Sequence, residues 1–192
     1  MHSGKTAQAL IALGGNLPFE GDAPEVTLPK ACAALADEGL AIQSISRLYR
    51  TPCFPAGAGP DYVNAAAVIA VPSGTGAGTV LAGLHAVEAR FGRERLQRWG
   101  MRTLDIDLVA FGDSVQPDPV TQDHWRNLPP AARAREAPGQ LILPHPRLQD
   151  RAFVLVPLAD VAPDWVHPRT GLTVRQMLAA LPLSDRDAVK SL

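Results

Sequence analysis

The most informative segment of this 192-residue chain is Arg98-Trp99-Gly100-Met101-Arg102-Thr103-Leu104-Asp105-Ile106-Asp107-Leu108-Val109. From Thr103 onward, two sets of side chains alternate with a period of two, which is typical of a half-buried β-strand. Because alternate side chains of a strand share a face, Asp105 and Asp107 are expected to stand about 6.5–7 Å apart on the same side. The segment therefore predicts a strand that carries two neighbouring carboxylates.

These two carboxylates repel each other unless a cation lies between them, and hard oxygen ligands on a rigid strand suit Mg²⁺. Arg98, Trp99 and Arg102 lie just upstream. Guanidinium groups bind phosphate oxygens in pairs and keep their charge at any physiological pH. The segment thus favours a site for a nucleoside polyphosphate. The alternative for a lone Asp-x-Asp is a solvent-facing strand that carries acids without function, and the neighbouring arginines and tryptophan make it the weaker one.

Composition limits the classes of protein that the chain can belong to. Hydrophobic residues make up 46% and charged residues 19%, with a net charge of −1, as in an ordinary globular domain. This charge gives no general attraction to nucleic acid or to an anionic membrane. No apolar run approaches the length of a signal or transmembrane segment, and the two cysteines lack the spacing of a zinc site. We expect one domain over residues 1–192 of a cytoplasmic protein with reduced thiols.

The order of expected elements favours an α+β sandwich. We expect strands at 9–13, 41–49, 62–71 and 103–111, and helices at 27–38, 81–91, 150–160 and 173–181. Thr27 is expected to cap the first helix and Gly39 to end it, and Gly14-Gly15-Asn16 is expected to form a turn. Because the loop 51–60, not a helix, joins the middle strands, a mainly antiparallel sheet packed by helices is favoured over a doubly wound parallel one.

The segment from residue 113 to residue 140 has five prolines and no convincing periodicity. We expect it to form a long inserted loop near the active cleft, with Trp125 packing it down. Loops of this length in compact domains are usually functional or disordered.

Three further groups of residues could bind ligands, although each has an ordinary structural interpretation. Gly92-Arg93-Glu94-Arg95 suits phosphates, or is a solvated helix end. Pro144-His145-Pro146 places an imidazole on a restricted backbone, or holds a structural histidine. In Tyr62-Val63-Asn64 an amide offers the donor and acceptor that a 2-amino-4-oxo heterocycle requires, or bonds locally. No Walker-type phosphate loop is present, because Gly4-Lys5-Thr6 lacks the upstream glycine and strand.

Together these segments resemble the 6-hydroxymethyl-7,8-dihydropterin pyrophosphokinase family from Ala9 to about Pro168. The resemblance is carried by Ile11-Ala12-Leu13-Gly14-Gly15-Asn16, Ser46-Arg47-Leu48-Tyr49-Arg50-Thr51-Pro52, Pro60-Asp61-Tyr62-Val63-Asn64-Ala65, Glu88 with residues 92–95, residues 98–107, and Leu143-Pro144-His145 with Arg151-Ala152-Phe153. The chain departs from the family pattern at Gly15, His85, Met101 and Gln140, and residues 113–140 are longer than in compact relatives.

The resemblance implies a ferredoxin-like α+β fold and the transfer of pyrophosphate from ATP to the pterin hydroxymethyl oxygen, with release of AMP, in folate biosynthesis. It implies two Mg²⁺ ions on Asp105 and Asp107. The implied catalytic residues are Arg95, Arg102, Asp105 and Asp107. Pterin contacts are implied for Thr51, Pro52, Phe54, Tyr62, Asn64 and Phe153. ATP contacts are implied for Glu88, Arg93, Arg95, Trp99, Arg102, Leu108, His145 and Arg151.

Two other functions are compatible with the same residues. One is a two-metal nucleotidyltransferase, because Asp-x-Asp strands on similar sandwiches also serve polymerisation chemistry. The other is a nucleotide-binding or scaffold protein without turnover. We expect a monomer whose partners are ATP and the pterin, with no nucleic acid and no membrane.

Overall fold

The computed structural model describes residues 7–53, 57–92 and 102–192. Within these ranges six strands form one sheet in the order β5-β1-β4-β3-β6, and β2 also pairs with β4. Every pairing between named strands is antiparallel, as predicted. In chain order the strands are β1 (Ala7–Gly15), β2 (Ala41–Ile45), β3 (Tyr49–Thr51), β4 (Tyr62–Val71), β5 (Asp105–Phe111) and β6 (Lys190–Ser191).

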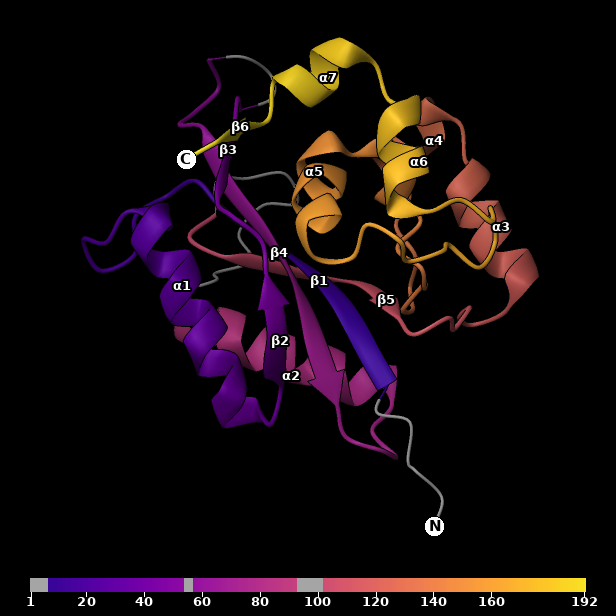
Figure 1. The fold of residues 1–192 in the computed structure, drawn as a ribbon, viewed down its shortest axis with the longest axis horizontal. Helices are drawn as coiled ribbons and strands as arrows, with labels where there is room; N and C mark the ends of the chain where they lie inside the picture. Colours follow the sequence, from indigo (N-terminus) through magenta and orange to yellow (C-terminus); the bar gives the residue numbers. More distant parts are fainter. Residues whose placement is uncertain (1–6, 54–56, 93–101) are drawn as a thin grey trace.

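Helices cover both faces of the sheet, so the fold is the expected α+β sandwich (Figure 1). The helices α1 (Pro24–Ala34) and α2 (Ala77–Arg90) pack on one face, and α5 (Ala152–Val161) and α6 (Val174–Ala180) lie on the other. The remaining helices are the 3₁₀ turns η1 (Leu35–Glu38) and η2 (Leu148–Asp150), with α3 (Pro119–Asn127), α4 (Pro130–Arg135) and α7 (Leu183–Asp187). Among the described residues, no helix is both long enough and apolar enough to span a membrane.

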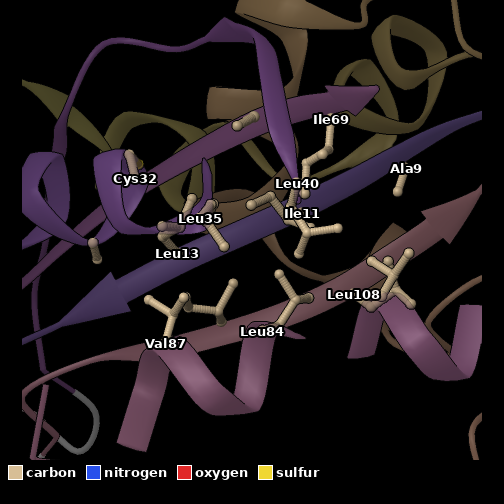
Figure 2. Close-up of a cluster of buried hydrophobic side chains, with 14 of the residues drawn as sticks. Ala9, Ile11, Leu13, Cys32, Leu35, Leu40, Ile69, Leu84, Val87 and Leu108 are labelled. Atoms are coloured by element: carbon tan, nitrogen blue, oxygen red, sulfur yellow. The ribbon is translucent and has the colours of Figure 1, made fainter. Parts of the chain in front are cut away.

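The central strand β1 supplies apolar side chains to both cores because its residues alternate between the two faces. Ile11 packs with α1 and α2, and Leu10 packs with α5 and α6. Figure 2 shows Leu84 and Val87 of α2 directed at the sheet beside Ile11. This double burial explains why β1 is an almost continuous apolar run.

The predicted start of the first helix at Thr27 is wrong. The first helix begins at Pro24, and Thr27 does not cap it, since its hydroxyl donates to the Ala23 carbonyl (3.2 Å) within the first turn. Proline suits the first helical position because its fixed φ is helical and the missing N–H has no partner there in any case. Gly39 ends the following 3₁₀ turn with a φ of +73°, as predicted.

The predicted strand 41–49 is interrupted, and β2 and β3 are separate strands. At the break, the Ser46 hydroxyl accepts a hydrogen bond from Ala66 N (2.9 Å) and so replaces part of the ladder. Arg47 and the Tyr49 hydroxyl both donate to the Asp160 carboxylate of α5. The chain leaves the sheet here because these polar side chains bond to α5.

The prediction of a loop over 113–140 is also wrong, because this segment contains α3 and α4. The Asp118 carboxylate caps α3 by accepting from Thr121 N (2.9 Å), and Pro119 occupies the first helical position. This pairing of an aspartate cap with a following proline is the sequence signal that indicates a helix start. The segment does line a large cavity, as expected, and Trp125 is half-buried there.

Replacing Leu84 with alanine tests the packing of α2 on the sheet. Leu84 has no exposed surface, so we expect Leu84→Ala to lower the free energy of unfolding by about 2–5 kcal/mol through lost burial and a residual cavity. Urea titration followed by circular dichroism measures this change. Leu183→Ala is the matched control, because that side chain is 67% exposed and its loss should cost within about 0.5 kcal/mol. Equal effects of the two substitutions would contradict the assigned core.

Candidate active site

Three neighbouring strands place Asn64, Gly14 and Asp105 in one row. In register, Gly14 of β1 lies opposite Asn64 of β4 on one side and opposite Asp105 of β5 on the other. Directly opposite residues of antiparallel strands share a face, and adjacent strands are about 4.8 Å apart. The amide and the carboxylate therefore occupy the same face, about 10 Å apart, with a glycine between them.

The two glycines of β1 are needed for close approach, and the predicted turn at 14–16 is wrong, because β1 extends through Gly15. A Cβ on Gly14 would lie 3.0 Å from Asn64 Oδ1, and one on Gly15 would lie 2.4 Å from the Thr103 carbonyl oxygen. A side chain at either position would force its neighbour to move. Glycine thus lets the Asn64 amide lie across β1 and lets the chain before β5 pack against it.

Asp105 and Asp107 both line one large cavity of about 690 Å³, and both are half-buried. Each carboxylate faces an arginine: Asp105 Oδ2 contacts Arg102 Nη1, and Asp107 Oδ2 lies 3.7 Å from Arg151 Nη1. The predicted geometry, two acids on one face of a strand beside arginines, is confirmed. Volumes of this order are typical of small-molecule sites.

The outer edge of β5 is closed by side and main chain groups from two other segments. A β-bulge at Val109 turns its carbonyl outward to accept from His145 N (2.8 Å). Ile106 N, between the two aspartates, donates to Glu88 Oε1 (2.6 Å). Glu88 is 1% exposed and is not among the residues that line the cavity. The structure therefore gives Glu88 a positioning role at the edge of β5, and its implied contact with ATP stays a prediction.

His145 presents a neutral imidazole to the cavity. Its Nδ1 accepts a hydrogen bond from Arg147 N (3.1 Å), which leaves the proton on Nε2. Burial lowers the pKa of His145 to about 3, and the nearby Arg151 and Arg147 guanidiniums add to the effect. His145 is thus an uncharged Nε2–H donor at neutral pH, suited to a phosphate oxygen.

The start of α5 brings a cation and an aromatic ring to the cavity wall. The Arg151 guanidinium lies 5.7 Å from the centre of the Phe153 ring. Burial lowers the pKa of Arg151, and the Asp107 carboxylate opposes this shift. Phe153 is 41% exposed although it is a large apolar side chain. An aromatic face left in a cleft in this way can stack on a planar ligand.

Residues of β3 and β4 form the polar end of the cavity. Asn64 Nδ2 donates to Thr51 Oγ1 (2.8 Å), which fixes the amide, and Asn64 is 5% exposed. Tyr62 lies opposite Thr51 in register, and Pro52 follows. All four residues line the cavity. The structure thus brings together four of the residues for which the resemblance implies contact with the pterin.

Asn16 is a positioning residue for which the sequence patterns indicated no role. Its Oδ1 accepts from Arg102 N (2.9 Å), its own N donates to Arg102 O (2.9 Å), and its Nδ2 donates to Pro60 O (3.2 Å). Asn16 therefore joins the segment before β5 to the loop before β4. A buried polar residue at the end of an apolar strand is the signal that could have indicated this role.

Leu108 also lines the cavity, as do Arg147, His85 and Trp125, for which no site role was predicted. Phe54, Arg93, Arg95 and Trp99, for which the resemblance implies substrate contacts, lie outside the described residues. The structure therefore brings together the predicted site residues that lie on the strands and at the start of α5.

Comparison with known proteins gives one consistent result. The family model of 7,8-dihydro-6-hydroxymethylpterin-pyrophosphokinase (HPPK) matches residues 10–163. The 2-amino-4-hydroxy-6-hydroxymethyldihydropteridine pyrophosphokinase of Synechocystis sp. is 39% identical over 171 residues, 88% of this chain and 74% of the relative. The protein of the same name from Pseudomonas aeruginosa is 35% identical over 173 residues, 90% of either chain.

Solved structures agree on the fold. The crystal structure of Plasmodium falciparum HPPK-DHPS wild type with pteroate has a TM-score of 0.62 and 14% identity, covering 91% of this chain and 44% of that one. The present chain thus spans less than half the length of that solved chain, and the likeness concerns its fold.

The state of His145 can be tested directly by NMR of protein labelled with ¹⁵N-histidine. We expect His145 to show the pattern of a neutral Nε2–H ring from pH 8 to pH 5, because a pKa of about 3 leaves only about 1% protonated at pH 5. Comparison with His145→Gln identifies its resonances. A titration midpoint near 6.5, or a ring protonated on Nδ1, would contradict the hydrogen bonding described above.

Proposed function

The chain belongs to the 7,8-dihydro-6-hydroxymethylpterin-pyrophosphokinase family, and on this premise we propose that its main cavity performs the reaction of that family. A pyrophosphoryl group passes to the hydroxymethyl oxygen of 6-hydroxymethyl-7,8-dihydropterin, a step of folate biosynthesis. The donor is ATP, and the second product is AMP. The observation that carries this proposal is that Asp105 and Asp107 line one cavity together with Asn64, the arginines Arg102 and Arg151, and His145.

The donor set at Asp105 and Asp107 fits Mg²⁺. Two half-buried carboxylates share one face of a strand, and within the described ranges no cluster of three or more His, Cys, Asp or Glu forms a closed metal cage. Mg²⁺ commonly binds through one or two carboxylates and completes its shell with substrate phosphates and water. We propose that these two residues hold two ions. When bound, the ions would neutralise phosphate charge and polarise the transferred group.

The cationic and neutral donors around the acids orient the phosphates. Arg102 and Arg151 are placed to bind phosphate oxygens in pairs, and the Nε2–H of His145 donates without adding charge. The acceptor hydroxyl oxygen attacks the β-phosphorus, the bond from that phosphorus to the AMP oxygen breaks, and the hydroxyl proton passes to water. Because such transfers depend mostly on positioning and charge stabilisation, the reaction requires no strong general base.

The polar end of the cavity suits the pterin. The Asn64 amide, fixed by Thr51, offers a donor and an acceptor to the edge of the heterocycle, and the rings of Tyr62 and Phe153 offer faces for stacking. Arg93, Arg95, Trp99 and Phe54 are proposed to add further contacts with ATP and the pterin. A net charge of −1 and two free cysteines support a cytoplasmic protein that binds no nucleic acid. We also propose that it acts as a monomer.

A nucleotidyltransferase would use the same pair of acids, and the products separate the two reactions. AMP with a pyrophosphorylated pterin supports the proposal, whereas release of free pyrophosphate supports nucleotidyl transfer. ATP binding without turnover in the presence of Mg²⁺ and the reduced pterin would indicate a protein that binds nucleotide only.

Removing either central carboxylate tests the assignment of the metal ligands. We expect Asp105→Asn and Asp107→Asn to lower kcat at least about a hundredfold, ~2.7 kcal/mol of barrier, because charge stabilisation in the transition state is lost. The assay supplies ATP, Mg²⁺ and 6-hydroxymethyl-7,8-dihydropterin and measures AMP. The control is Asp37→Asn, an exposed residue paired with Arg90 at the surface, and it should stay within twofold of the unaltered protein. A decrease of less than threefold at Asp105 would show the assignment to be wrong.

Removing the Asn64 amide tests recognition of the pterin. We expect Asn64→Ala to raise KM for the pterin about tenfold or more, because buried polar groups of ligand and protein lose their partners, and to leave KM for ATP within twofold. Steady-state kinetics with each substrate varied in turn measures both constants. Asn127→Ala, at the exposed end of α3, is the matched control. Equal increases in the two KM values would refute a pterin-specific role.

A further inference from the structure

The end of the cavity farthest from Asn64 is built partly by α3, the helix that the sequence did not predict. Trp125 of α3 and Leu128, which follows it, line the cavity together with Leu81 of α2 and Ile142. These four side chains are apolar and one is a flat aromatic, unlike the Asn64 amide and the Thr51 hydroxyl, while His85, Glu136 and Gln140 add polar groups to the cavity wall. The family resemblance assigned no role to any residue of α3.

This apolar end lies beyond the outer edge of the sheet. Asn64 and Asp105 lie two strands apart, and β5 is the edge strand on that side. The helix α2 packs against β5, and α3 follows β5 in the chain and lies to that side of the molecule in Figure 1. The cavity therefore runs from the pterin end, past the acids of β5, to a wall made by α2 and α3.

The geometry of phosphoryl transfer fixes which ligand group occupies this wall. The attacking and leaving oxygens lie roughly in line on opposite sides of the phosphorus that is transferred. With the acceptor held at Asn64 and the phosphates held at Asp105 and Asp107, the leaving nucleoside monophosphate must extend away from Asn64. Its base is the planar, largely apolar part of the donor that remains to be bound.

We propose that Trp125 and Leu128 form the wall against which the base of the nucleotide donor packs, so that α3 is a nucleotide-recognition helix of this chain. This inference rests on the proposed function, and it makes Trp125 and Leu128 determinants of the affinity of the protein for the nucleotide donor. Aromatic side chains suit this task because any purine offers a π face.

The helix α3 is held rigidly enough to act as such a wall. Gln122 is fully buried, and its Nε2 donates to the Pro144 carbonyl (3.2 Å), next to His145. Asp123 accepts from Arg169 Nε (3.1 Å), and these pairs tie α3 both to the phosphate-binding segment and to the chain after α5. Val120, on the same helix, is 80% exposed and does not line the cavity. The cavity-facing position of Trp125 is thus set before any ligand binds.

Binding of two probes to the full chain separates contact with the base from contact with the phosphates. The probes are α,β-methylene-ATP, which cannot be cleaved at the reacting bond, and inorganic tripolyphosphate, each titrated calorimetrically with Mg²⁺. We expect Trp125→Ala to weaken α,β-methylene-ATP about tenfold, ~1.4 kcal/mol, and to leave tripolyphosphate within twofold. Trp125→Phe should recover most of the loss, and the matched control Val120→Ala should bind both probes as the unaltered protein does.

The kinetic counterpart is a rise of about tenfold in KM for ATP in Trp125→Ala, with KM for the pterin unchanged. Equal weakening of both probes, or an unchanged affinity for α,β-methylene-ATP, would overturn the proposal. If Trp125→Ala does not fold, Leu128→Ala carries the same comparison of probes. Failure of the proposed function is distinct from these outcomes, because the unaltered protein would then produce no AMP from ATP and the pterin.

Discussion

The mutual repulsion of Asp105 and Asp107 is the constraint on which the rest of this structure depends. Two carboxylates on one face of a strand cannot move apart, because the backbone fixes their spacing. Their charge must therefore be balanced from outside the strand. Arg102 faces the first carboxylate and Arg151 the second. The arginines that balance the acids are also the groups that suit phosphates, so the site is ready for a highly charged substrate.

The acids are useful only if β5 itself is held in place, and as an edge strand it lacks a neighbour on one side. Glu88 supplies an acceptor to Ile106 N, and the Val109 bulge supplies a carbonyl to His145 N. These two bonds pair backbone groups of β5 that a neighbouring strand would otherwise pair. The bond to Val109 also places His145 near the acids, so the same hydrogen bonds satisfy the edge of β5 and position a residue of the site.

The residues that line the cavity differ in polarity from one strand or helix to the next. On the sheet side, Gly14 carries no side chain and lets the Asn64 amide approach across β1. Trp125 of α3 and Leu128 add apolar surface to the cavity, and the buried Gln122 of α3 donates to the Pro144 carbonyl next to His145. A linear substrate pair, with a polar heterocycle at one end and a base at the other, matches this order.

The sequence by itself determined the strand with its two acids, the α+β order of elements and the family, because period-two alternation and short motifs are properties of neighbouring residues. It also indicated that 113–140 lies near the cleft. Local patterns could not reveal that Gly14 and Gly15 end a strand, since only the approach of Asn64 and Thr103 requires glycine there. Likewise, the burial of Glu88, the linking role of Asn16 and the contribution of α3 to the cavity wall arise from contacts between segments that are distant in the chain. Such contacts leave no periodic signal, so they appear only once the sheet, α2 and α5 are packed together.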